Sequence, residues 1–133
     1  MCRTLLNCIR IKKKKMKNIL IITIIIPFNL LSQYTNIPDE NFELALLNLG
    51  YDFVIDGVVE TSTIDTITIL QINGNNISDL TGIEDFLSLE DINLWASSSS
   101  LLDSINLSQN TQLRVVEIRY HQNLTYINVS NNS

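Results

Sequence analysis

A spaced pattern of apolar residues recurs through the second half of this chain. It starts at Ile67, starts again 22 residues later, and then again 24 residues after that. Its three copies are Ile67, Leu70, Ile72 and Asn75; Leu89, Ile92, Leu94 and Ser97; and Leu113, Val116, Ile118 and His121. A second, offset series lies between them, at Leu80 and Ile83; Leu102, Ile105, Leu107 and Asn110; and Leu124, Ile127, Val129 and Asn132. The pattern predicts a coil of stacked turns, because one turn alone cannot bury its apolar side.

The spacing matches the leucine-rich-repeat string L-x-x-L-x-L-x-x-N. In the first copy, Asn75 is expected to bend the chain away from the strand and to satisfy backbone groups inside the turn. Ser97 and His121 take that place in the later copies. We expect about three repeats in residues 66–133, with the last one incomplete and the second lengthened by the serine run at 97–100.

Residues 33–65 are expected to form an N-terminal cap. The stretch "NIPDENFELALLNLG" predicts a helix over 39–49, with Asp39 capping its first turn. Gly50 is suited to the left-handed conformation that ends such a helix. The expected apolar face of the helix is Phe42, Ala45, Leu46 and Leu49. Next, "YDFVIDGVVETSTIDT" places an Asp56-Gly57 turn between two β-prone runs. Asp52 and Asp56 are too few ligands for a calcium loop.

The charges are distributed unevenly along the chain. Seven of the nine basic residues lie in residues 1–32, whereas all 14 acidic residues come later. Residues 33–133 keep two basic residues against those 14 acidic ones, so their net charge is −12. A body this acidic repels phosphate backbones and anionic membranes, which argues against nucleic acid as a partner.

Residues 1–32 are expected to be a basic leader and signal peptide. Lys17 precedes the apolar run "ILIITIIIPFNLL", and a small residue follows it. The run is too short for a transmembrane helix, which needs about 20 residues. Cleavage is expected between Ser32 and Gln33, and Met16 is an alternative start. The protein is therefore predicted to be secreted or displayed on the cell surface, with no stable membrane insertion after cleavage.

Several stretches resemble the secreted leucine-rich-repeat proteins of flavobacteria and their relatives, which have internalin-like short repeats. They are "IPDENFELALLNLGYD", "ISDLTGIEDF", "INLSQNTQL" and "LTYINVSNNS", and the resemblance covers nearly all of residues 37–133. It implies a solenoid of the α/β type, mainly β: a right-handed coil with one parallel strand per turn and a small helical cap. It also implies export and a role in recognition or adhesion rather than catalysis. Such proteins often continue into more repeats, and this chain is expected to be a truncated member.

The sequence offers no catalytic set, so no enzyme activity, metal or cofactor is expected. The chain has one histidine, His121, and it occupies the asparagine position of a repeat. No G-x-S-x-G signature is present, and both cysteines, Cys2 and Cys8, lie in the leader. The acidic pairs at 84–85 and 90–91 are interpreted as solvated turn residues. Two classes of function remain: a module that binds a protein or glycan, and a spacer or decayed remnant without a ligand of its own.

The expected binding surface is the concave face of the strands, because alternate side chains of a strand point to opposite faces. Three columns should cross it: Ile69, Asp91 and Val115; Gln71, Asn93 and Glu117; and Asn73, Trp95 and Arg119. The site prediction takes the second and third columns. An exposed tryptophan beside an arginine is typical of binding hot spots. In the alternative interpretation, Trp95 covers the enlarged serine turn. The last repeat, with Leu124, Ile127 and Val129, is expected to be uncapped and to allow self-association.

Overall fold

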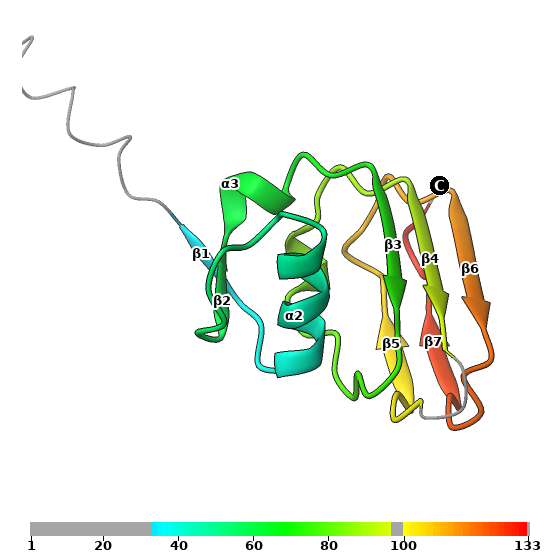
Figure 1. The fold of residues 1–133 in the computed structure, drawn as a ribbon. Helices are drawn as coiled ribbons and strands as arrows, with labels where there is room; N and C mark the ends of the chain where they lie inside the picture. Colours follow the sequence, from blue (N-terminus) through cyan, green and yellow to red (C-terminus); the bar gives the residue numbers. More distant parts are fainter. Residues whose placement is uncertain (1–32, 97–99, 133) are drawn as a thin grey trace, which may run out of the picture. The chain divides into compact units, whose positions relative to one another are not determined.

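The computed structural model describes residues 33–96 and 100–132. The chain divides into two compact units, Met1–Leu31 and Ser32–Ser133, and the description concerns the second. The leader, its cleavage site and Ser97 lie outside the described residues, so the predictions made for them stay predictions. Within the described part of the chain, no helix is long and apolar enough to cross a membrane. Short strands dominate this part and recur in parallel, which makes it a β-rich repeat fold (Figure 1).

The N-terminal part contains two strands and two short helices. Strand β1 (Tyr34–Asn36) pairs antiparallel with β2 (Val58–Glu60), helix α2 (Glu40–Asn48) lies between them in sequence, and α3 (Thr61–Ile64) follows. Asp39 caps α2, because its Oδ1 accepts the backbone N–H groups of Asn41 and Phe42 at 2.9 and 3.0 Å. Gly50, just past the helix, has φ +80°, the left-handed conformation expected there.

Asp39 also ties the helix to the first repeat. Its Oδ2 accepts the backbone N–H and the hydroxyl of Ser78 at 2.8 and 2.7 Å, and the N–H of Asp79 at 3.1 Å. Burial alone would raise the pKa of Asp39, but the hydrogen bonds from Ser78, Phe42 and Asp79 outweigh it and leave the pKa below its usual value. One carboxylate therefore joins a helix start to a turn about 40 residues away in sequence.

The buried face of α2 differs from the predicted one in two residues. Phe42 and Leu46 are fully buried and Ala45 is partly buried, as expected, but Leu49 is 43% exposed. Leu49 is the residue that ends the helix, so it lies beyond the last turn that packs on the core. Glu43 is buried instead, at 1% exposure, because its Oε1 accepts the N–H groups of Asp56 and Gly57.

The repeats form two parallel sheets. Strands β3 (Ile69–Asn73), β4 (Asp91–Trp95) and β6 (Val115–Arg119) make one sheet in that order. Strands β5 (Ser104–Asn106) and β7 (Tyr126–Asn128) make the other. The first copy of the offset series forms no strand that could pair with β5; it forms a 3₁₀ turn, Ile83–Asp85. Figure 1 shows β3, β4 and β6 side by side, with α2 next to β3. The first apolar series thus falls on paired strands in all three copies, and the offset series does so in its second and third copies.

The inward residues of the first two copies are buried in the core, whereas most of those in the third copy are at least partly exposed. Leu70, Ile72, Leu89, Ile92 and Leu94 are all at most 3% exposed. In the third copy Leu113 is buried, but Val116, Ile127 and Val129 are 38%, 44% and 47% exposed. The prediction that Val116 points into the core is therefore only partly met, because none of the described strands lies beyond β6 to cover it. The self-association expected through this turn stays a prediction.

Asparagines bridge successive turns on the offset side. The Nδ2 of Asn110 donates to the carbonyl oxygens of Ile83 and Phe86 at 2.7 and 3.2 Å. One turn later, the Nδ2 of Asn132 donates to the carbonyl oxygens of Leu107 and Asn110 at 3.0 and 2.7 Å. Asn110 is fully buried, whereas Asn132 is only partly buried. The asparagine of the repeat therefore satisfies carbonyls of the turn before it.

Two local predictions about surface segments are corrected by the structure. The β-prone run at 51–55 forms no strand; it is a loop, and only the run after Gly57 becomes a strand, β2. The acidic pair at 84–85 is more than a solvated turn. Asp85 Oδ2 accepts the hydroxyl of Thr35 at 2.6 Å, and Glu84 Oε2 accepts the backbone N–H of Gly82 at 2.8 Å. These two carboxylates therefore hold the first repeat against β1 and close their own turn.

Candidate functional site

The strand register places all six predicted site residues in two rows across one sheet. The central row aligns Gln71 with Asn93, and Asn93 with Glu117. The next row aligns Asn73 with Trp95, and Trp95 with Arg119. The third column predicted from the sequence, Ile69, Asp91 and Val115, forms the row on the other side. In β3 and β4 these positions alternate with buried leucines and isoleucines, and β6 continues the register, so they share the outer face of the sheet.

Polar side chains connect the two rows. Asn93 Nδ2 donates to Glu117 Oε2 at 2.8 Å, and an Arg119 guanidinium nitrogen donates to the same oxygen at 3.1 Å. The charged group of Arg119 thus pairs with Glu117. Both side chains of that pair are exposed, so the ion pair itself adds little to stability. Glu117 therefore contacts both Asn93 and Arg119 on this face.

Trp95 lies in the middle of its row and is 47% exposed. Backbone hydrogen bonds fix the strand end on both sides: the Gly74 N–H donates to the Trp95 carbonyl oxygen at 2.8 Å, and the Ala96 N–H donates to that of Arg119 at 3.0 Å. The serines at 97–99 lie outside the described residues, so the interpretation in which Trp95 covers their turn stays open. About half of the Trp95 surface is nevertheless accessible, on the strand next to Arg119.

A hollow lies where this face meets α2. It has a volume of about 340 Å³ and is lined by helix residues Asn41, Leu44, Ala45, Asn48 and Leu49 and by Gln71, Ile72, Asn73, Asn75 and Asn76. Leu44 and Leu49 are 40% and 43% exposed. Gln71 and Asn73 therefore belong both to the rows of the sheet and to the hollow. Residue spacing could not predict this hollow, because it depends on where α2 packs beside β3.

His121 contacts Ser100 but does not form a catalytic arrangement with it. Ser100 Oγ lies 2.7 Å from His121 Nδ1, while His121 Nε2 is buried without a hydrogen-bond partner. A serine nucleophile needs a base that a carboxylate orients, and its hydroxyl must be reachable by substrate. Here Ser100 is only 6% exposed, and the ring packs on Gly74, where an added Cβ would lie 2.5 Å from the imidazole. Among the described residues, no group of three or more His, Cys, Asp or Glu is placed to hold a metal.

The environment of His121 predicts a loss of stability at mildly acidic pH. Burial lowers the pKa of His121 below its ordinary value of 6.5, because a charged ring would be poorly solvated. The unfolded chain then binds the proton more readily than the folded one. The free energy of unfolding should be highest above pH 7 and decrease as the pH falls through about 6.5 towards 5.5, by at most about 1.4 kcal/mol per pH unit for one proton.

Urea unfolding at a series of pH values measures this effect, and His121→Asn is the matched control. His121 is the only histidine in the chain, and asparagine is the residue that the repeat string has at this position. The variant should show a flatter profile between pH 7.5 and 5.5. An equally steep decrease in His121→Asn would show that another group causes it.

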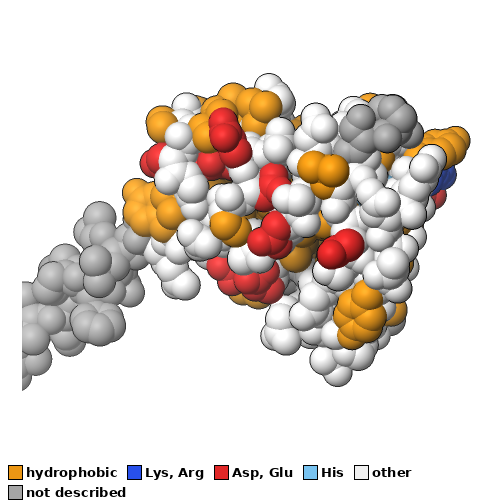
Figure 2. Space-filling model, turned by 90° about the horizontal axis from the view of Figure 1, so that it is seen from below, with side chains coloured by type: hydrophobic (Ala, Val, Ile, Leu, Met, Phe, Trp, Pro, Cys, Tyr) orange, Lys and Arg blue, Asp and Glu red, His pale blue; other side chains and the backbone are white. Residues whose placement is uncertain are grey.

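The described surface is strongly acidic. Only Arg114 and Arg119 are basic among residues 33–133, and each lies beside a glutamate, with Arg114 3.7 Å from Glu90 and Arg119 3.1 Å from Glu117. Figure 2 shows acidic side chains gathered on the face seen there, with hydrophobic side chains between them. A surface of this sign attracts basic partners and repels anionic ones.

Comparisons with known proteins found little. No family model matches the chain, and no curated protein matches it. Among solved structures it is similar to the functional domain of InlJ from Listeria monocytogenes, a structure described as including a cysteine ladder. The identity is 18%, the TM-score is 0.39, and the match covers 76% of this chain. This chain spans only 29% of the length of that one. No match places the chain among the flavobacterial proteins that its sequence resembles, so that assignment stays a prediction.

Proposed function

We propose that this protein is a non-catalytic recognition module, secreted or on the cell surface, that binds a protein ligand on the outer face of β3, β4 and β6. The observation that carries the proposal is the row of Asn73, Trp95 and Arg119, where the only tryptophan of the chain is half exposed and lies in register with Arg119, whose guanidinium pairs with Glu117. Aromatic and arginine side chains contribute most of the energy at many protein interfaces.

The negative charge of the protein favours a ligand with a basic surface. Residues 33–133 contain two basic and 14 acidic residues, so a ligand with a basic surface is steered towards them. The amides of Gln71, Asn73 and Asn93 then offer hydrogen bonds around the tryptophan, as interface rims commonly do. A neutral glycan could use the same amides and the indole, and the binding experiment distinguishes that outcome.

The proposal includes a finer description of the fold. We infer that the two parallel sheets are two sides of a right-handed leucine-rich-repeat coil, to which successive turns contribute successive strands. Support comes from the matched registers: β3 pairs with β4 and β4 with β6 on one side, while β5 pairs with β7 on the other. In such a coil the outer face of β3, β4 and β6 would be the concave surface that repeat proteins use for binding.

Replacing Trp95 by alanine should weaken ligand binding by about tenfold or more, since a hot-spot side chain contributes at least about 1.4 kcal/mol. Arg119→Ala should weaken it by a smaller factor. The melting temperature should change little in both variants, because Trp95 and the Arg119 side chain are about half exposed. The probes are peptides selected from a random displayed library on the wild-type protein, together with a neutral glycan array.

Tyr126→Ala is the matched control. Tyr126 is an aromatic residue of similar exposure, 58%, but it lies on β7 in the other sheet. Selected peptides that bind all three variants equally would contradict the proposal. Binding confined to glycans would replace the protein ligand by a saccharide, and a wild-type protein that selects nothing would favour the spacer or remnant. If the Trp95→Ala variant unfolds, the indole is needed for the fold and the binding proposal loses its central residue.

A further inference from the structure

Three consecutive apolar residues are exposed in the loop between α2 and β2. Phe53, Val54 and Ile55 are 86%, 59% and 41% exposed. Scattered apolar residues are normal on a protein surface, but a run of three exposed side chains costs solubility and usually has a function. Phe53 has the highest exposure among the large hydrophobic residues of the described chain.

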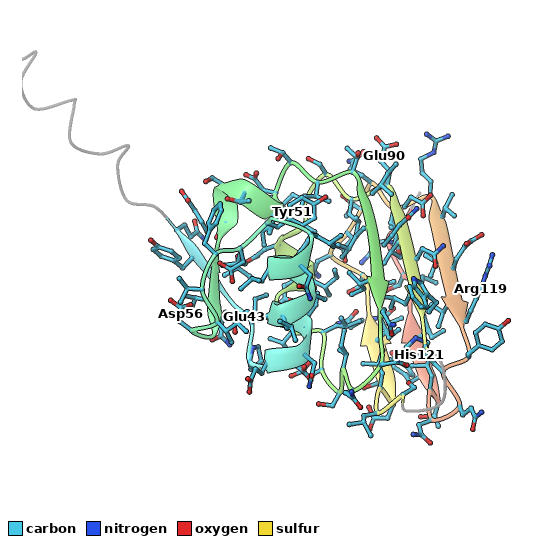
Figure 3. All side chains as sticks on the ribbon, viewed as in Figure 1. Glu43, Tyr51, Asp56, Glu90, Arg119 and His121 are labelled. Atoms are coloured by element: carbon cyan, nitrogen blue, oxygen red, sulfur yellow. The ribbon has the colours of Figure 1, made fainter. Side chains whose placement is uncertain are left out.

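Hydrogen bonds fix the end of this loop at residues 56–57, and the acceptor on α2 is a buried carboxylate. The carboxylate of Glu43, at 1% exposure, accepts the N–H groups of Asp56 and Gly57 at 2.9 and 2.7 Å. The Ile37 N–H donates to the Gly57 carbonyl oxygen at 2.8 Å. Figure 3 shows Tyr51 and Asp56 towards the two ends of the segment, with Glu43 on α2 near Asp56. The apolar side chains are thus displayed on an ordered base, which reduces the entropy lost on binding.

The loop is flanked by negative charge on both sides. Asp52 precedes Phe53; its Oδ1 accepts the Phe53 N–H at 2.7 Å, and its Oδ2 is buried. Asp56 follows Ile55, and its Oδ1 accepts the Val58 N–H at 3.2 Å. An apolar tip between two carboxylates is complementary to an apolar surface bordered by basic side chains. The same charges oppose an anionic bilayer, and a second copy would bring its own Asp52 and Asp56 against them.

We propose that Phe53, Val54 and Ile55 form a docking loop for a partner protein that offers an apolar surface bordered by lysine or arginine. Phe53 packs at the centre of that surface and Val54 and Ile55 pack beside it. The exposed Asp56 faces the basic border, and Asp52 adds to the negative charge there. This site belongs to the cap, whereas the face with Trp95 belongs to the repeats, so the two proposals stand independently.

The experiment measures binding of the full chain to an amphipathic helical peptide of leucine and lysine, which presents an apolar stripe bordered by lysines. Phe53→Ser should weaken binding by about tenfold or more, as for a central anchor residue. Leu87→Ser is the control, because Leu87 is 58% exposed and the substitution also leaves the charge unchanged. It should bind like wild type. Asp56→Asn keeps an acceptor oxygen for Val58 and should weaken binding several-fold at low salt.

The other possible occupants give different results. A leucine–glutamate helix should not bind, and vesicles of phosphatidylcholine should not retain the protein. Equal binding of the leucine–lysine helix by wild type and Phe53→Ser would overturn the proposal. Vesicles that retain the wild type but not Phe53→Ser would overturn the proposal in favour of a membrane surface. A wild-type dimer that Phe53→Ser converts to a monomer would overturn the proposal in favour of a second copy of this chain. Unchanged circular dichroism and melting confirm that the variants are folded.

Discussion

Replacing Asn110 by alanine should lower the free energy of unfolding by about 1–3 kcal/mol, because two buried hydrogen bonds worth about 0.5–1.5 kcal/mol each are lost. Asn110 is fully buried, and its amide donates to the carbonyl oxygens of Ile83 and Phe86. Alanine removes this donor, and each oxygen keeps only one backbone N–H, that of Phe86 or that of Leu89. The change in the urea midpoint, at constant slope, measures the loss.

The matched control is Asn132→Ala, one turn later. Asn132 makes the same kind of bridge, to the carbonyl oxygens of Leu107 and Asn110, but it is only partly buried. Water can therefore replace its amide, and the loss should be about 1 kcal/mol or less. Equal losses in the two variants would contradict the claim that burial makes the Asn110 bridge the important one.

Replacing Phe86 by alanine should lower the free energy of unfolding by about 3–5 kcal/mol, the usual cost of deleting a buried phenylalanine. Phe86 is fully buried in the offset segment of the first repeat, and its ring stacks on Phe42 of α2 with centroids 6.4 Å apart. The substitution therefore removes a contact between the cap and the repeats as well as apolar area.

The neighbouring residue provides the control for this experiment. Leu87 is 58% exposed, and Leu87→Ala should change the free energy of unfolding by less than about 0.5 kcal/mol. Because cap and repeats share one core around the Phe42–Phe86 pair, both variants should unfold in a single transition. Two separate transitions in the wild-type protein would show that the two parts do not depend on each other.

The repeats could be predicted from sequence because their spacing fixes the register. Once Ile67 and Leu89 are placed in equivalent positions, every outward residue of β3 and β4 has its partner, and the strand pairing follows. Burial in the last repeat could not be predicted in the same way. Val116 and Ile127 have the right spacing, but an apolar residue becomes buried only where a neighbouring turn covers it, and spacing carries no information about that.

The cap was harder to predict because its contacts are irregular. The spacing of α2 suggested that Leu49 faces the core, whereas Leu49 ends the helix and is exposed. Glu43 is buried instead, because it binds the backbone of the 51–57 loop. β-propensity at 51–55 suggested a strand, but none of the described strands pairs with Phe53 to Ile55. Their exposure became visible only in the structure.

The rows of the candidate site were predictable, but the contacts within them were not. Alternation along the strands placed Asn93 beside Glu117 and Trp95 beside Arg119, as the register requires. The side-chain geometry then decided that Arg119 pairs with Glu117. Side-chain pairing depends on rotamers and on the distances between head groups, which residue spacing does not determine.

The most direct test of the recognition surface is acrylamide quenching of the tryptophan fluorescence, because Trp95 is the only tryptophan of the chain. With the indole 47% exposed, we expect the free folded protein to be readily quenched and to emit at long wavelength. A peptide selected from the displayed library should shift the emission to shorter wavelength and protect the indole. An indole that is already shielded from acrylamide in the free protein, or that stays fully quenchable when the peptide is bound, would contradict the account.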